Sequence, residues 1–262
     1  MYQRIMYNLL LGLLLCASPA ILPAFETATS AEFEALRQDL EALKQGQETL
    51  GKDVAEIKKL LQALQPPPPV RAIDAVLEAG DSPSKGEKDA TLILIEFSDY
   101  ECPFCRRHAE TTLPQLEKDY IATGKLRYLF RDFPLETIHA QAAKAAEAAH
   151  CAGEQGRYWE MHDNLFANQK ALAPEKLTAY AKAIGVTAGP FKKCLGSGKY
   201  MDKVRNSVAE GHRLGITGTP ALLLGINEGG KVKNAKIIAG ALPFSVFKEE
   251  IDKLLAEQSA KK

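Results

Sequence analysis

The most regular pattern of apolar positions runs through residues 33–64. Apolar side chains recur there at alternating intervals of three and four residues, with Glu, Lys, Asp and Gln between them. The positions of this seam are Phe33, Leu36, Leu40, Leu43, Gln47, Leu50, Val54, Ile57, Leu61 and Leu64. Such an a/d repeat predicts a coiled coil, which we expect over residues 31–65, and its one polar position, Gln47, would help to fix the register. The alternative is a single amphipathic helix that packs on its own domain.

A run of four prolines at residues 66–69 follows this repeat. Proline lacks a backbone N–H and cannot continue a helix, so the predicted helix ends here. Consecutive prolines favour the extended polyproline II conformation, which predicts a stiff spacer. A globular domain is then expected over residues 70–262.

Apolar runs and helical periodicity alternate within residues 70–262. The expected elements are an edge strand at 70–76, a buried strand from 92 that stops at 98–99, a helix from 103 to about 122 with a kink at Pro114, a strand at 125–130, a helical block at 136–215, hairpin strands at 221–226 and 231–239, and a helix at 243–255. This order predicts an α/β fold: a thioredoxin-like domain with an inserted helical subdomain, preceded by the α-helical coiled coil.

The N-terminal residues have the pattern of a targeting segment. Arg4 precedes an apolar run at residues 9–15, and small residues follow at 18–20. We expect residues 1–24 to be a secretory signal peptide or an N-terminal anchor. Acylation of Cys16 is a weaker alternative because Leu15 stands where a small residue is expected. Either form of export predicts a periplasmic or otherwise extracytoplasmic protein, in a compartment that permits disulfides.

Charge and cysteine content narrow the function further. The chain has 33 basic and 33 acidic residues and a formal net charge of zero, which argues against nucleic acid as a partner. Apart from Cys16, its cysteines are Cys102, Cys105, Cys151 and Cys194. Four cysteines allow three pairings, and adjacency favours Cys102 with Cys105. We expect a structural disulfide between Cys151 and Cys194, with two buried free thiols as the alternative.

Cys102 and Cys105 fall where the buried strand gives way to a helix. Free N–H groups and the helix dipole stabilise an anion at a helix N-terminus, and Pro103 suits the first helical turn. Arg106 and Arg107 add positive charge within a turn of both sulfurs. We therefore expect Cys102 to have a lowered thiol pKa and to be the attacking sulfur of a redox-active pair.

The segment Phe97-Ser98-Asp99-Tyr100-Glu101-Cys102-Pro103-Phe104-Cys105 resembles the active-site strand and helix of DsbA-like thiol–disulfide oxidoreductases. The likeness continues at residues 131–135, 155–162 and 215–220, in the order of the family, and covers residues 70–256. It implies that Cys102 is the exposed nucleophile and Cys105 the resolving thiol. It also implies a cis-proline at Pro220 beside the disulfide, and a substrate-binding surface that includes Thr219, Pro103 and Phe104.

Two further residues matter for the chemistry that the resemblance implies. Glu96 lies near the end of the buried strand, where an acid is costly unless it is partnered or functional. In the family a carboxylate at this place is thought to shuttle protons to the resolving cysteine; the alternative is a glutamate at an exposed strand end. Phe104 replaces the histidine of the best-known oxidants of the family and cannot stabilise a thiolate by charge, so we expect a weaker oxidant.

The expected function is that of an extracytoplasmic protein thiol–disulfide oxidoreductase that forms, reduces or isomerises disulfides in exported proteins. Its expected partners are exported substrates with cysteines, a membrane or soluble redox partner, and further copies of the chain. The coiled coil resembles that of oligomeric relatives and favours isomerisation or reduction. No cofactor beyond the Cys102–Cys105 disulfide is expected, and no metal, because only His108 could add a ligand nearby. The alternative is a non-enzymatic oligomeric chaperone or a copper-handling protein with the dithiol as ligand.

Overall fold

The computed structural model describes residues 29–64, 70–74 and 76–260. The chain divides into two compact units, Met1–Pro66 and Pro67–Lys262. The predicted signal peptide or anchor at 1–24, with Cys16, and the predicted polyproline spacer at 66–69 lie outside the described residues. Among the helices that are described, none is long and apolar enough to cross a membrane.

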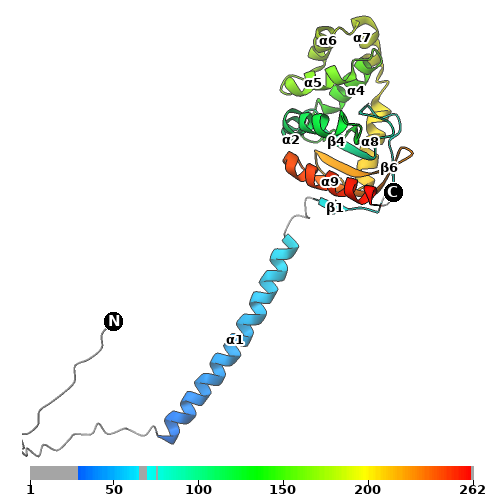
Figure 1. Ribbon diagram of the computed structural model, residues 1–262. Helices are drawn as coiled ribbons and strands as arrows, with labels where there is room; N and C mark the ends of the chain where they lie inside the picture. Colours follow the sequence, from blue (N-terminus) through cyan, green and yellow to red (C-terminus); the bar gives the residue numbers. More distant parts are fainter. Residues whose placement is uncertain (1–28, 65–69, 75, 261–262) are drawn as a thin grey trace, which may run out of the picture. The chain divides into compact units, whose positions relative to one another are not determined.

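In the part of the first unit that the structure describes, residues 29–64 form one helix, α1 (Ser30–Leu64), of 35 residues, where the heptad pattern predicts it (Figure 1). Its start is a capping box: the Thr29 N–H donates to Glu32 Oε2 at 2.7 Å, and the Glu32 N–H donates to Thr29 Oγ1 at 3.4 Å. The apolar seam residues between Phe33 and Ile57 are each 55–74% exposed in the single chain. A continuous apolar stripe of this kind is the face through which coiled-coil helices pair.

The second unit is built on a seven-stranded sheet with the order β1-β7-β6-β4-β5-β3, to which β2 adds by pairing with β7. The strands are β1 (Val70–Ala72), β2 (Leu77–Glu78), β3 (Ser84–Lys85), β4 (Leu92–Ser98), β5 (Leu126–Asp132), β6 (Ala221–Glu228) and β7 (Lys231–Ala239). The central strand β4 pairs parallel with β5 and antiparallel with β6. Every residue of β4 and β5 is buried, as expected for strands covered on both faces.

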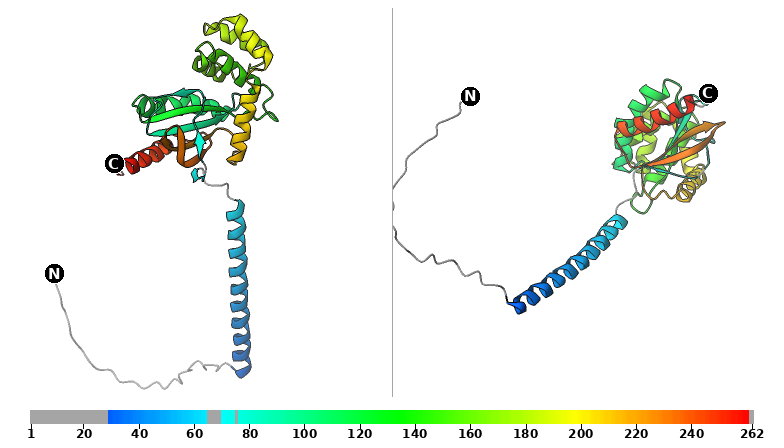
Figure 2. Two further views of the ribbon diagram at one scale, coloured as in Figure 1. Left: turned by 90° about the vertical axis from the view of Figure 1, so that its right-hand side faces the viewer. Right: turned by 60° about the horizontal axis from the view of Figure 1, so that its bottom comes forward.

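Helices cover the sheet and form a separate layer beyond it (Figures 1 and 2). They are α2 (Pro103–Arg107), η1 (His108–Thr112), α3 (Leu113–Leu116), η2 (Glu117–Ile121), α4 (Ala142–Gly153), α5 (Tyr158–Ala167), α6 (Pro174–Ala183), α7 (Ala188–Ser197), α8 (Met201–Arg213) and α9 (Phe244–Ser259). The helices α4 to α7 gather around their own apolar core, and α8 returns to pack on β5. This is the predicted thioredoxin-like domain with an inserted helical subdomain.

The close approach of α8 to the sheet depends on one glycine. A Cβ added at Gly211 would lie 2.5 Å from Cε2 of Phe133 and 3.2 Å from Cδ1 of Phe97. Because atoms cannot approach so closely, any larger residue at this position would push α8 away from the residues that flank the active-site strand.

Several elements differ from the sequence prediction in detail. The helix expected from 103 to about 122, with a kink at Pro114, consists of two short α-helical segments, α2 and α3, and two π-helical segments, η1 and η2. Pro114 lies in the first turn of α3, directly after η1, so the wider π turn accommodates the missing N–H where a simple kink was expected. The predicted edge strand at 70–76 is shortened to β1 (Val70–Ala72), and β2 follows it only at Leu77–Glu78. The two-residue strand β3 is too short to show a period.

Candidate active site

The dithiol lies at the junction between β4 and α2. Helix α2 begins at Pro103 as predicted, and Cys102 is its extended N-cap residue, with φ −75° and ψ 119°. Both sulfurs are free thiols in this structure, and Cys105 is fully buried. The expectation of an exposed nucleophile is wrong, since Cys102 is 4% exposed. It lies beside the Thr219–Pro220 turn, and its sulfur is 3.3 Å from the Thr219 carbonyl oxygen, to which the protonated thiol donates.

The environment moves the pKa values of the two thiols in opposite directions. The pKa of Cys102 is lowered to about 6, most strongly by a hydrogen bond from the Cys105 thiol and further by the Thr219 side chain and the N–H groups of Cys105 and Phe104. Burial raises the pKa of Cys105 well above its ordinary value, and the nearby Cys102 and Glu96 add to this. At neutral pH the pair therefore consists of a Cys102 thiolate and a Cys105 thiol.

The two arginines of α2 do not act as expected. The Arg106 side chain pairs with Glu110 at 2.7 Å, and the Arg107 guanidinium donates to the Ala241 carbonyl oxygen at 2.9 Å. Neither is among the main causes of the lowered Cys102 pKa, which are hydrogen bonds. The helix N-terminus and the neighbouring thiol thus stabilise the thiolate, as the position of Cys102 predicts.

The remaining substrate-side residues form the surface around Cys102. The Thr219–Pro220 peptide bond is cis, and Pro220 directly precedes β6, which pairs with β4. A groove of about 630 Å³ runs beside this turn; it is lined by Arg71, Gly215, Ile216, Thr217, Gly218, Thr219, Pro220, Ala221, Ile237, Ala239 and Gly240. Pro103 is exposed, and Phe104 is 54% exposed with the Arg107 guanidinium 5.2 Å from its ring centroid. An apolar side chain therefore lies in solvent beside the dithiol.

Glu96 is buried inside β4, and the alternative of an exposed strand end is wrong. Its carboxylate accepts a hydrogen bond from Ser98 Oγ at 2.7 Å and another from the Tyr128 hydroxyl. His108 of η1 lies beyond it, with Nε2 3.6 Å from Glu96 Oε2. The acid is therefore held by neutral donors under the resolving cysteine.

Residues that the sequence analysis did not single out hold the turn before Cys102. Asp99 accepts the Glu101 and Leu135 N–H groups, each at 2.7 Å, and its carboxylate contacts His139 Nδ1 at 2.8 Å. From the opposite side, the Gln169 amide donates to the carbonyl oxygens of Tyr100 and Cys102, each at 2.8 Å. Two distant loops thus fix the turn, and no local sequence signal indicates this.

Cys151 of α4 and Cys194 of α7 form a disulfide with an S–S distance of 2.00 Å. Both residues are buried within the core of the helical subdomain. The alternative of two free thiols therefore does not apply in this structure. The bond ties the first helix of the subdomain to the last one before α8.

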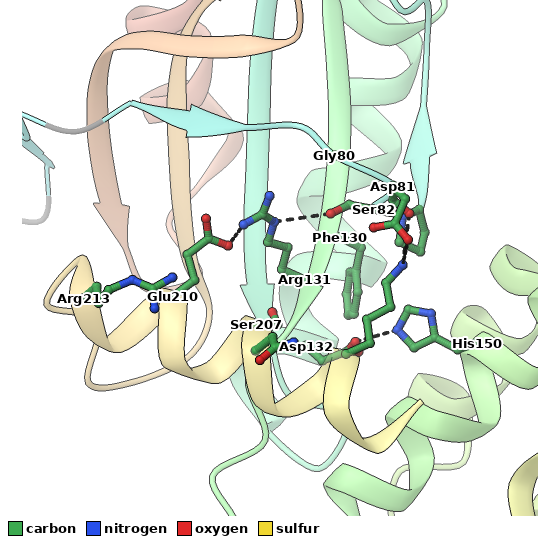
Figure 3. A pocket seen from close by; sticks show the side chains of 13 residues that line it. Gly80, Asp81, Ser82, Phe130, Arg131, Asp132, His150, Ser207, Glu210 and Arg213 are labelled. Carbon is green, nitrogen blue, oxygen red and sulfur yellow. Dashed lines mark hydrogen bonds and ion pairs between the residues drawn. The ribbon is translucent and has the colours of Figure 1, made fainter. Parts of the chain in front are cut away.

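A polar cavity of about 460 Å³ lies where α8 meets the end of β5 (Figure 3). Arg131 contacts Glu210 and donates to Ser82 Oγ, and His150 Nε2 contacts Asp132 Oδ2 at 2.7 Å. Lys203 pairs with Asp81 at 2.7 Å across the same opening. Since each of these acids already has a partner, the cavity is an ion-paired junction between elements and differs from the dithiol site in having no thiol in its lining.

No three His, Cys, Asp or Glu side chains within the described residues are grouped so that they could hold a metal ion. His108, the one nearby ligand that the sequence offers, lies against Glu96. The reactive groups that the described residues bring together at this site are the two thiols and the buried acid Glu96.

Comparison with known proteins finds a matching family model and several related sequences. Residues 78–253 match the family model described as thioredoxin. A probable disulfide bond formation protein D of Bacillus anthracis is 30% identical over 151 residues, which are 55% of this chain and 70% of that protein. A Na⁺/H⁺ antiporter NhaA 3 of Salinispora tropica is 34% identical over 140 residues, so the chain matches 53% of its own length and only 21% of the antiporter.

Solved structures resemble the same unit. The crystal structure of α-DsbA1 from Wolbachia pipientis has a TM-score of 0.61 and 26% identity, covering 70% of this chain and 94% of that one. Oxidised BdbD from Bacillus subtilis has a TM-score of 0.62 and covers 71% of this chain and 98% of that one, at 23% identity. The second likeness concerns the fold alone.

Proposed function

The chain belongs to the thioredoxin family, in its DsbA-like group, and on this premise we propose that it is an extracytoplasmic protein thiol–disulfide oxidoreductase. The observation that carries the proposal is the contrast between its two thiols. Cys102 has a pKa of about 6, whereas burial holds the pKa of Cys105 well above its ordinary value. A pair that differs in this way has one sulfur ready to attack and one held in reserve.

In the reducing direction, the Cys102 thiolate attacks one sulfur of a substrate disulfide. A Cys102–substrate disulfide forms, and the other substrate sulfur leaves as a thiolate. Cys105 then loses its proton and attacks Cys102, so that the Cys102–Cys105 disulfide forms and the second substrate sulfur departs. Two electrons pass from the dithiol to the substrate. Oxidation of a substrate follows the same steps in reverse. In isomerisation a different substrate thiolate attacks the substrate sulfur of the mixed disulfide, so that a new substrate disulfide forms and Cys102 leaves as the thiolate.

The groove beside Thr219 and Pro220 is the proposed site of the substrate chain. Thr219 lines it, and the Thr219 carbonyl oxygen lies 3.3 Å from the Cys102 sulfur, so the groove passes close to the dithiol. The exposed Phe104 ring adds an apolar contact on the other side of the dithiol. Unfolded or misfolded proteins present extended backbone and apolar side chains, which this surface suits.

An extracytoplasmic location is part of the same proposal. The disulfide between Cys151 and Cys194 supports it, because such bonds persist in oxidising compartments. The pattern of residues 1–24 supports it as well. The proposed partners are exported proteins with cysteines and a membrane or soluble protein that resets the redox state of the dithiol.

We further propose that α1 joins copies of the chain in a coiled coil. Its seam residues expose large apolar side chains, which a parallel or antiparallel partner helix would cover. A homo-oligomer would present several dithiols to one misfolded chain, which favours isomerisation or reduction over simple oxidation. The dithiol chemistry itself does not depend on this assembly.

The test uses the full chain and scrambled ribonuclease A. We expect the wild type to restore ribonuclease activity and Cys102→Ala to abolish this effect, whereas a non-enzymatic chaperone would be unaffected by the substitution.

The coiled coil is tested separately. The seam variant L40E/L43E should become monomeric in sedimentation and lose isomerase activity while it still reduces insulin. The variant A42E/Q45E, which adds the same charge outside the seam, is the matched control. A monomeric wild type would contradict the coiled coil, and an active Cys102→Ala would contradict the enzyme.

A further inference from the structure

His108 is a buried histidine next to the dithiol that the exchange steps above do not use. It begins η1, three residues after Cys105, and its side chain is completely buried. Its backbone N–H bonds to the carbonyl oxygens of Cys105 and Phe104, so its position is tied to the active-site turn. Within the described part of the chain, neither ring nitrogen has a hydrogen-bond partner. A buried polar ring without partners is costly and calls for a functional explanation.

The ring faces the carboxylate of Glu96. Nε2 of His108 lies 3.6 Å from Glu96 Oε2, just beyond hydrogen-bond length, so a small shift of the ring would join them. From α5, His162 is the other charged or titratable group that acts on the ring, while α9 contributes the apolar Phe247 ring at 5.4 Å. On β5, Tyr128 reaches the same carboxylate through its hydroxyl.

The charge states of these groups suit proton transfer. Burial lowers the pKa of His108 from its ordinary value, and the opposing effect of the Glu96 charge is smaller. The imidazole is therefore neutral at neutral pH and keeps one nitrogen lone pair free. Burial raises the pKa of Tyr128 well above its ordinary value, so the phenol remains a donor to Glu96.

The hydrogen bonds of Glu96 show why a second group is needed. Both carboxylate oxygens already accept a hydrogen bond, Oε1 from Ser98 and Oε2 from Tyr128. When the carboxylate takes up a proton it becomes a donor, and its O–H then requires an acceptor. The free nitrogen of His108 is a buried acceptor without a hydrogen-bond partner among the described residues, and Nε2 lies 3.6 Å from Oε2.

We propose that His108 is a positioning residue that acts through Glu96, accepting a hydrogen bond from the protonated carboxyl group when Cys105 gives up its proton. The inference rests on the proposed function, since it concerns the second step of exchange. In that step the Cys105 S–H bond breaks and its proton passes to Glu96, whose O–H bonds to His108. The Cys105 thiolate attacks Cys102, the Cys102–Cys105 bond forms, and the substrate thiolate leaves. In the oxidative direction the proton returns to Cys105.

The test follows the two steps separately in the full, reduced chain. Oxidised glutathione is added, samples are quenched with acid, and mass spectrometry follows the glutathione adduct on Cys102 from pH 5 to 9. In His108→Phe we expect adduct formation within twofold of wild type and resolution by Cys105 at least tenfold slower at pH 7, with the pH profile of resolution displaced to higher pH. His108→Asn, whose amide oxygen can accept a hydrogen bond, should stay within threefold of wild type.

Two further variants distinguish this role from a structural one. E96Q/H108F should resolve the adduct no more slowly than E96Q, because His108 acts through Glu96. Thr112→Val is the matched control: Thr112 is buried in the same π segment and donates to the Leu242 carbonyl oxygen at 3.3 Å, so its loss should leave the pH profile unchanged.

The inference is overturned if His108→Phe resolves the adduct with wild-type rate and pH dependence, or if its effect multiplies with that of E96Q. If His108→Phe fails to fold, the decision rests on His108→Asn: slowing greater than threefold with an unchanged pH profile would overturn the proposal. A wild type that neither forms nor resolves the adduct would overturn the proposed function, and this inference with it.

Discussion

Cys102 and Cys105 lie one helical turn apart, yet their thiol pKa values move in opposite directions. The hydrogen bond from the Cys105 thiol is the largest cause of the lowered Cys102 pKa, and burial is the largest cause of the raised Cys105 pKa. Each thiol thus depends on the other: the buried thiol keeps its proton, and by sharing that proton it stabilises its partner as an anion.

The first prediction concerns the pH at which Cys102 becomes reactive. In the reduced chain, alkylation by iodoacetamide should rise with pH around a midpoint of about 6, since only the thiolate reacts. Cys105→Ala removes the strongest hydrogen bond and should move this midpoint upward. The ultraviolet absorbance of the thiolate, followed against pH, gives the Cys102 midpoint in the wild type and in Cys105→Ala. An unchanged midpoint in Cys105→Ala would contradict the proposed cause.

The second prediction concerns the Thr219 side chain, the next contributor to the lowered Cys102 pKa. Thr219→Val keeps the shape of the side chain and removes the hydroxyl, so the pKa of Cys102 should rise, by less than in Cys105→Ala. Thr217→Val, at an exposed position of the same loop, is the control. Equal pKa values in Thr219→Val and wild type would show that the hydroxyl does not contribute.

The third prediction concerns the disulfide of the helical subdomain. C151S/C194S removes a cross-link over a sequence separation of 43 residues, and should lower the free energy of unfolding by ~2–4 kcal/mol. Urea unfolding of the oxidised chain measures the difference. Because this bond lies outside the dithiol, Cys102 alkylation in the folded variant should keep its midpoint, and a shifted midpoint would mean that the subdomain controls the site.

The fourth prediction compares two glycines. Gly211→Ala places a methyl group against Phe133 and should destabilise the domain by ~1–3 kcal/mol. Gly189→Ala, in α7, meets no other atom within 4 Å and should be neutral or stabilising by up to ~1 kcal/mol, because alanine favours the helix. Thermal and urea unfolding give both values. Similar effects at the two positions would contradict the described packing of α8.

The fifth prediction concerns the residue that follows Pro103. Phe104→His introduces a side chain that can stabilise the Cys102 thiolate by charge or hydrogen bonding, which favours the dithiol form. The reduction potential should become more oxidising by ~30 mV, which corresponds to ~1.4 kcal/mol for this two-electron couple. Phe104→Leu is the matched control. A potential that is the same in all three proteins would exclude Phe104 as a determinant.

Much of the fold follows from local sequence patterns. The boundary between β4 and α2, the hairpin of β6 and β7 and the length of α1 are all visible as changes in apolar periodicity and in turn residues. The π-helical segments η1 and η2 cannot be read from such patterns, because π-helical turns have no distinctive residue composition. The short β3 is likewise fixed by its partner β5.

The sequence identified the two thiols of the site, but it did not indicate the residues that pack around them. The low exposure of Cys102 depends on Thr219 and Gln169, which lie 117 and 67 positions away in the chain. Arg106 was expected to act on the sulfurs, but its side chain pairs with the Glu110 carboxylate one turn further along the chain. The approach of His108 to Glu96, at 3.6 Å, comes from the packing of the active-site helix against β4, and no local sequence pattern indicates it.

The reduction potential of the full chain, obtained by equilibration with reduced and oxidised glutathione, tests the central claim most directly. We predict that Cys102 and Cys105 titrate together as one two-electron couple, with a potential more reducing than the value of about −120 mV typical of DsbA. Thiols that never form an internal disulfide at any glutathione ratio would contradict the assignment as an oxidoreductase.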